Sequence, residues 1–177
     1  MAAFAPGNLS LLLAIPVIGA VILVLIPRQK SKTHFNCALF FTGLTFLWSL
    51  NILARFDGAQ GEMQLLERVP WMRFYGIEYF VGIDGISLFL ILLTTFLMPI
   101  AILASWSVKD KIKEYLFFML ILETGMLGAF VALDLFLFYV FWEVMLVPMY
   151  FLIGVWGGAR RIYAAVKFVL YTLAGSL

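Results

Sequence analysis

The chain has 177 residues, of which 64% are hydrophobic and only 12% are charged, and its formal net charge is +2. This composition excludes an ordinary soluble domain and predicts a polytopic membrane protein. The small net charge argues against nucleic acid as a partner, because the basic residues cluster beside apolar segments instead of forming a stripe.

Apolar runs along the chain, each near the ~20 residues that cross a bilayer, predict about six transmembrane helices. They cover about residues 8–26, 33–53, 85–106, 114–133, 134–156 and 161–177, and we expect a single membrane domain over residues 1–177. The predicted fold is an all-α membrane bundle. The last run has no charged or aromatic anchor at its end, which favours a piece of a longer polypeptide.

Basic residues between the runs predict the orientation, because cytoplasmic loops carry an excess of lysine and arginine. Eight lie in the first, third and fifth connections and three in the second: Arg28, Lys30, Lys32, Lys109, Lys111, Lys113, Arg160 and Arg161 against Arg55, Arg68 and Arg73. We therefore expect the N-terminus outside, in the inner membrane of a bacterium.

The second connection, residues 54–84, is the long one and is expected on the outer face. Loose alternation of polar and apolar residues over 69–82, around Gly76, predicts a small β-hairpin there. Asp84 directly precedes the third run and is expected to cap its helix. Pro99 and Pro148 are expected to kink their helices, because each removes a backbone donor.

Two carboxylic acids lie within the apolar runs. Glu123 lies ten residues before Leu133, in the turn between their helices, and Glu143 lies ten residues after it, so each is about 15 Å from the turn. A charge at that depth costs about 2.5–3.5 kcal/mol on the lenient insertion scale, so these acids are candidates for a proton path. Pro148 supports this for Glu143, because it frees a carbonyl close by. The alternative is that one or both acids stay protonated and only form hydrogen bonds between helices.

Lys167 lies six residues past Arg161, about 9 Å into the sixth helix. One interpretation makes its ammonium the charge partner of Glu143, as part of the same proton path. The other is that the long side chain returns its charge to the membrane surface.

Several motifs of redox and hydrolytic chemistry are missing from the sequence: a glycine-rich phosphate loop, a CxxC pair, paired haem-ligand histidines, and a nucleophile with a nearby base. We expect no redox centre, cofactor or metal site in this chain.

The sequence resembles the family of subunit M (chain 4) of proton-pumping NADH:quinone oxidoreductase, respiratory complex I, over essentially its whole length. Four segments carry the resemblance: residues 82–99 with Gly82-Ile-Asp-Gly-Ile-Ser87, residues 122–125, the long run 134–158 around Phe-Trp-Glu143-Val-Met-Leu-Val-Pro148, and residues 167–176. In this family, the fifth-helix glutamate at Glu143 pairs with a seventh-helix lysine, and Glu123 matches a fourth-helix glutamate. The chain stops before that seventh helix.

The resemblance implies an antiporter-like membrane-arm subunit that takes part in proton translocation. The parent complex uses NADH, flavin, iron–sulfur clusters and quinone, and the expected partners are the other membrane-arm subunits and the lipid bilayer. Two alternatives remain open: a subunit of a multi-subunit cation/proton antiporter or membrane-bound hydrogenase, and a membrane scaffold without transport.

Overall fold

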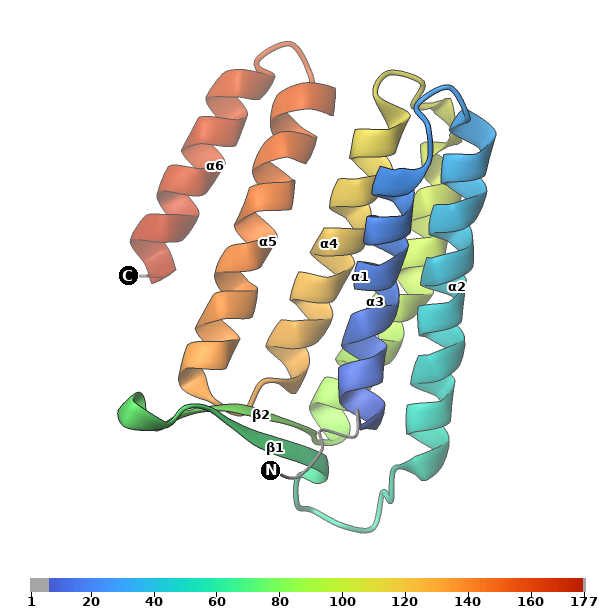
Figure 1. The fold of residues 1–177 in the computed structure, drawn as a ribbon. Coiled ribbons are helices and arrows are strands. Elements are labelled where there is room, and N and C mark those ends of the chain that lie inside the picture. The colour runs from blue at the N-terminus through green and yellow to red at the C-terminus, as the bar shows by residue number, and fades with distance from the viewer. Residues whose placement is uncertain (1–6, 177) are drawn as a thin grey trace.

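A bundle of long helices forms the body of the protein in a computed structural model, which describes residues 7–176 (Figure 1). The helices are α1 (Asn8–Leu25), α2 (Ser31–Arg55), α3 (Gly85–Ala104), α4 (Ile112–Val131), α5 (Leu135–Trp156) and α6 (Arg161–Ser176). In the described part of the chain, five of them, α1 to α5, are long and apolar enough to cross a membrane. The predicted all-α membrane bundle is confirmed.

The helices alternate in direction, so the loops gather at two ends of the bundle (Figure 1). We call the end with the α1–α2, α3–α4 and α5–α6 loops the basic end, and the opposite one the hairpin end. The observed helices lie within two residues of the expected bounds; α3 ends at Ala104 and continues as a 3-10 turn, Ser105–Ser107. The expected end of the last helix, residue 177, lies outside the described residues.

Strands β1 (Gln64–Met72) and β2 (Ile77–Ile83) form the antiparallel hairpin of the predicted fold, with Val69 opposite Tyr79. A 3-10 turn, Arg73–Tyr75, joins them and ends at Gly76, whose φ of 69° is left-handed and suits glycine. The first strand begins five residues earlier than the pattern indicated. The missed part contains a register shift between Gln64 and Glu67, where the adjacent Leu65 and Leu66 break the alternation of polar and apolar residues.

The hairpin is fastened to the bundle at two places. Glu67 of β1 accepts hydrogen bonds from the backbone N–H groups of Leu9 (2.7 Å) and Ser10 (3.1 Å), and so caps the start of α1. Phe80 of β2 accepts a hydrogen bond from the backbone N–H of Leu133, at 2.9 Å, in the turn between α4 and α5. The hairpin therefore lies across the end of the helices (Figure 1).

Aspartates begin the two helices that follow the hairpin and the α4–α5 turn. Asp84 accepts a hydrogen bond from the backbone N–H of Ser87 (2.7 Å), and the Ser87 hydroxyl accepts one from the backbone N–H of Asp84 (2.9 Å). This reciprocal pair is a capping box. Asp134 accepts a hydrogen bond from the backbone N–H of Leu137, at 3.0 Å. The hydrogen bonds from Ser87 lower the pKa of Asp84, because they favour its ionised form.

Helix α4 occupies the centre of the bundle and packs against α1, α2, α3 and α5. Near the hairpin end, Leu127 and Val131 join an apolar cluster with residues of α1 such as Leu9 and Leu12. Near the basic end, Leu116 and Leu120 join a second cluster, with residues of α1 and α2. The stretch of α4 between these clusters holds Glu123.

Candidate functional site

Two glycines of α4 let α5 approach closely. A Cβ atom on Gly125 would lie 2.6 Å from the Met145 side chain, and one on Gly128 would overlap the ring of Phe141. Small residues allow transmembrane helices to pack backbone against backbone in this way. These glycines therefore admit a neighbouring helix, and that neighbour is α5.

The two acids lie at matched depth on this helix pair. Glu123 precedes Val131, the last residue of α4, by eight residues, and Glu143 follows Leu135, the first residue of α5, by eight. At 1.5 Å per residue, each lies about 12 Å from its end of the helix.

Their side chains nevertheless point in opposite directions. Successive residues of a helix are turned by about 100°, so Glu123 lies about 200° around α4 from Gly125, which faces α5. Glu143 lies two residues from both Phe141 and Met145, the α5 residues that meet the glycines. Glu123 therefore faces the interior of the bundle, and Glu143 faces away from α4, toward α6.

Glu143 is half-buried and has a polar partner on α6. The Oγ atom of Ser176 lies 2.9 Å from its Oε1 atom and 3.1 Å from the carbonyl oxygen of Leu173. A hydroxyl has one proton to donate and can also accept. Ser176 can therefore donate to an ionised Glu143, or accept from a protonated Glu143 while it donates to Leu173.

A cavity of about 370 Å³ adjoins this pair, between α5 and α6. Ser176 lines it together with Tyr139, Tyr171 and Thr172, whose hydroxyl groups can hold water. On the same helix as Glu143, Pro148 leaves the carbonyl group of Val144 without its helical donor. The cavity thus lies next to Ser176, the hydrogen-bond partner of Glu143.

Glu123 has a contrasting environment. It is 0% exposed, and neither of its carboxyl oxygens has a hydrogen-bond partner among residues 7–176. An ionised carboxylate in such a place would be very costly, whereas a neutral acid is tolerated. The arrangement does not match the alternative in which this acid hydrogen-bonds neighbouring helices.

Buried hydroxyl groups of α2 and α3 form a layer that the sequence analysis missed. Thr42, Thr45 and Ser49 of α2 are each 0% exposed, and the Ser49 Oγ atom lies 2.8 Å from the Oγ1 atom of Thr95 in α3. Thr42 follows the first residue of α2 by eleven residues, as Glu123 follows the first residue of α4, so the two share a depth. The sequence does contain a signal for these hydroxyl groups: the three α2 residues are spaced by three and four positions, which places them on one helix face.

Pro99 leaves the carbonyl of Thr95 without its helical donor. The Thr95 hydroxyl donates to the carbonyl of Ile91, one turn earlier (2.9 Å), and is shared with Ser49 of α2. The polar pair therefore joins α3 to α2 at the level where Pro99 weakens the backbone ladder of α3.

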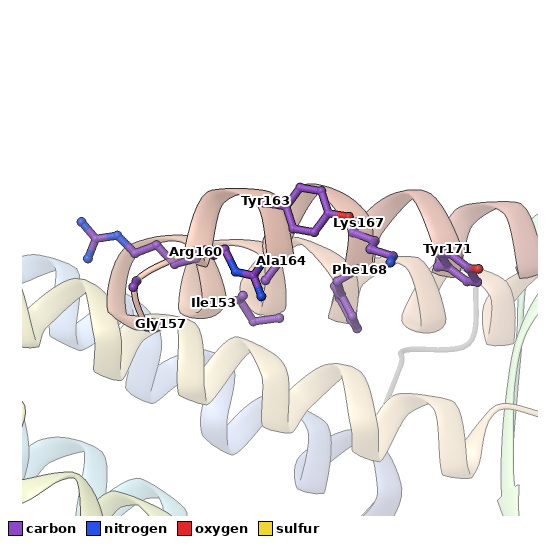
Figure 2. A pocket seen from close by; sticks show the side chains of 11 residues that line it. Ile153, Gly157, Arg160, Tyr163, Ala164, Lys167, Phe168 and Tyr171 are labelled. Carbon is purple, nitrogen blue, oxygen red and sulfur yellow. The ribbon is translucent and has the colours of Figure 1, made fainter.

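The fold does not place the side chain of Lys167 beside that of Glu143. Its Nζ atom lies 5.8 Å from the centre of the Tyr163 ring, one helical turn nearer the basic end, and the side chain is exposed. It lines a groove with Arg160 and Arg161 (Figure 2). This position agrees with the interpretation of Lys167 as a membrane-surface lysine.

Comparison with known families gives two matches that together span most of the chain. Residues 10–132 match the family described as NADH-ubiquinone oxidoreductase chain 4, amino terminus. Residues 132–177 match the family described as NADH:quinone oxidoreductase/Mrp antiporter, transmembrane part.

Curated relatives agree with these matches. NADH-quinone oxidoreductase subunit M of Rhodobacter capsulatus is 46% identical over 173 residues, which is 96% of this chain and 33% of the relative. NADH-ubiquinone oxidoreductase chain 4 of Arabidopsis thaliana is 46% identical over 172 residues, 96% of this chain and 35% of the relative. The chain thus spans about a third of the length of these relatives.

Solved structures show the same fold. A chain of respiratory complex I from Thermus thermophilus with bound NADH superimposes with a TM-score of 0.80 at 28% identity, over 94% of this chain and 33% of the other. A chain of an archaeal membrane-bound sulfane sulfur reductase superimposes with a TM-score of 0.77 over 96% of this chain and 26% of the other. At 21% identity, the second likeness shows the fold alone.

Proposed function

Because this chain belongs to the NADH-ubiquinone oxidoreductase chain 4 (subunit M) family, we propose that it takes part in proton translocation within a membrane-bound NADH:quinone oxidoreductase. It is an integral multi-pass membrane protein. Its expected partners are other membrane-arm subunits, and NADH, flavin, iron–sulfur clusters and quinone would be bound elsewhere in that assembly. We place the basic end in the cytoplasm of a bacterium and the N-terminus outside.

One observation carries the proposal: Glu143 lies in the middle of a transmembrane helix and shares a hydrogen bond with Ser176, which lines a cavity. Intramembrane acids that face the bundle interior or a water-filled cavity mark proton relays. In the proposed step, a hydronium ion in the cavity transfers its proton to the Glu143 carboxylate and becomes water, and the Ser176 hydroxyl turns from donor to acceptor.

Glu123 supplies a second proton position in this proposal, inside the bundle. Because it faces away from Glu143, direct exchange between the two carboxyl groups is not available in this arrangement. The layer of Thr42, Thr45, Ser49 and Thr95 gives hydroxyl groups on the interior side, where Glu123 faces. Lys167 is not part of the proposed path, because its ammonium lies over the ring of Tyr163 and not beside Glu143.

The decisive experiment replaces Glu143 by Gln in the complete complex. We expect proton pumping and coupled quinone reduction to fall by on the order of tenfold or more, with assembly preserved, because glutamine cannot carry a proton. Glu143→Asp keeps the acid and should retain part of the activity. Pumping per electron is measured in proteoliposomes.

Glu114→Gln is the matched control, because it removes a carboxyl group that pairs with Arg28 at the basic end, far from the cavity. Its pumping should stay close to that of the unmodified complex. Normal pumping stoichiometry in Glu143→Gln would contradict the proposal and favour a scaffold without transport.

A second candidate is a subunit of a multi-subunit cation/proton antiporter. The family description that matches residues 132–177 names the Mrp antiporter together with the oxidoreductase, which keeps this candidate open. Purification separates the two: an oxidoreductase subunit should co-purify with a quinone-reducing peripheral arm, whereas an antiporter subunit should not.

A further inference from the structure

A groove at the basic end combines positive charge with apolar walls. It lies between the end of α5 and the first turns of α6, and its volume is about 730 Å³ (Figure 2). Arg160, Arg161 and Lys167 line it, and of the described residues no acidic side chain does. The groove therefore has positive charge without an internal counter-ion.

Two other cations at the basic end are used within the protein. Lys113 donates hydrogen bonds to the carbonyl groups of Val24 and Ile26, both at 2.7 Å, and Arg28 pairs with Glu114 at 2.8 Å. The Arg160 guanidinium, in contrast, makes no ion pair or hydrogen bond with any residue in the range 7–176. Arg161 donates to the carbonyl of Val155, at 2.7 Å, which holds its guanidinium beside the loop.

The remaining walls of the groove are apolar or aromatic. Ile153 of α5 and Ala164 and Phe168 of α6 line it, together with Tyr163 and Tyr171 (Figure 2). Tyrosine is suited to the boundary between headgroups and acyl chains, because its ring is apolar and its hydroxyl is polar.

Toward the middle of the membrane, the groove continues with aromatic side chains of α6. Phe168 and Tyr171 line it beyond Lys167. The charges of Arg160 and Arg161 thus come at the membrane surface and the aromatic rings come below them, which is the order of groups in a phospholipid.

We propose that this groove binds the headgroup of an anionic phospholipid, with its phosphate among Arg160, Arg161 and Lys167 and its acyl chains along α6. Basic pockets between transmembrane helices at the cytoplasmic surface suit such headgroups, and each basic side chain contributes about 1 kcal/mol. The site involves neither Glu123 nor Glu143, so it is independent of the proposed proton path.

The test uses the complete complex in nanodiscs of phosphatidylcholine that contain a small share of photoactivatable phosphatidylglycerol. After illumination, mass spectrometry measures the lipid attached to the peptides of the α5–α6 segment. Arg160→Gln should lower this labelling about fivefold, and Arg160→Gln with Arg161→Gln more than tenfold. Arg160→Gln preserves the hydrogen bond between Arg161 and Val155, so its effect reports binding and not local unfolding.

The control is Lys30→Gln with Lys111→Gln, which removes two exposed charges from the same end without touching the groove. Its labelling of the α5–α6 segment should be unchanged. Three results would overturn the proposal: equal loss of labelling in this control, equal labelling by a photoactivatable phosphatidylcholine, or displacement of the lipid by millimolar inorganic phosphate. The last result would identify a site for a free anion.

Discussion

Lys167 is the residue for which the sequence left two interpretations and the structure favours one. Its ammonium lies over Tyr163 and lines the basic groove, away from Ser176 and Glu143. We therefore predict that Lys167→Met leaves the titration midpoint of the Glu143 carboxyl band unchanged in infrared spectra. A cation within ~4–6 Å would have favoured the ionised acid, so a shifted midpoint would show that the two side chains pair.

Asp84 allows a prediction about pH. Its folded pKa lies below the ordinary value of 3.8, so the cap stabilises α3 fully above that value and loses this contribution as the pH falls through the folded pKa. Asp84→Ala should cost about 1 kcal/mol at neutral pH, and the difference from the unmodified protein should vanish in acid.

Thermal unfolding of the purified protein in detergent, followed from pH 7 to pH 3, measures this effect. Asp84→Asn is the matched variant, because asparagine also caps helices but does not titrate. A cap contribution that persists unchanged at the acid end would contradict the assignment of the effect to Asp84.

The contact between α4 and α5 depends on Gly128, where any side chain would overlap the ring of Phe141. Gly128→Leu should force these helices apart and destabilise the bundle by about 1–3 kcal/mol or more. The melting temperature measures the cost. Gly43 of α2 has no neighbouring atom within 4 Å of such a Cβ, so Gly43→Leu is the control and should change stability little.

Helix rotation marks the limit of what could be predicted from the sequence. Counting residues from the turn placed Glu123 and Glu143 at matched depth, because depth depends only on the rise per residue. The direction of each side chain depends on which face of its helix packs against the neighbouring helix. In this pair, the packing of Phe141 and Met145 against Gly125 and Gly128 sets those faces. Which helix packs against these glycines depends on the tertiary structure.

The hydroxyl layer and the groove were missed for different reasons. The sequence displays the helical spacing of Thr42, Thr45 and Ser49. Hydroxyl groups are common in membrane helices, however, and they carry no charge that would mark them as candidate site residues. The groove needs α5 and α6 side by side, and Arg160 and Lys167, seven residues apart, come together only on the folded helix.

The orientation of the whole molecule follows from the loops at its two ends. We predict that a cysteine introduced at Lys30, at the basic end, is labelled by a membrane-impermeant thiol reagent only from the cytoplasmic side. Cys37, the chain's one cysteine, is first replaced by Ser to remove background. A cysteine at Phe74, which is 92% exposed in the hairpin turn, should be labelled only from outside. Labelling at position 30 from the outside and at position 74 from the cytoplasm would show that the topology is the reverse of the predicted one.

The cap that Glu67 provides for α1 joins two segments of the chain that are synthesised at different times. Leu9 emerges from the ribosome 58 residues before the carboxylate that accepts its N–H, so α1 is synthesised and inserted with its first donors bound only to water. The start of the first helix is thus capped only after the second helix and the beginning of the first strand have been synthesised.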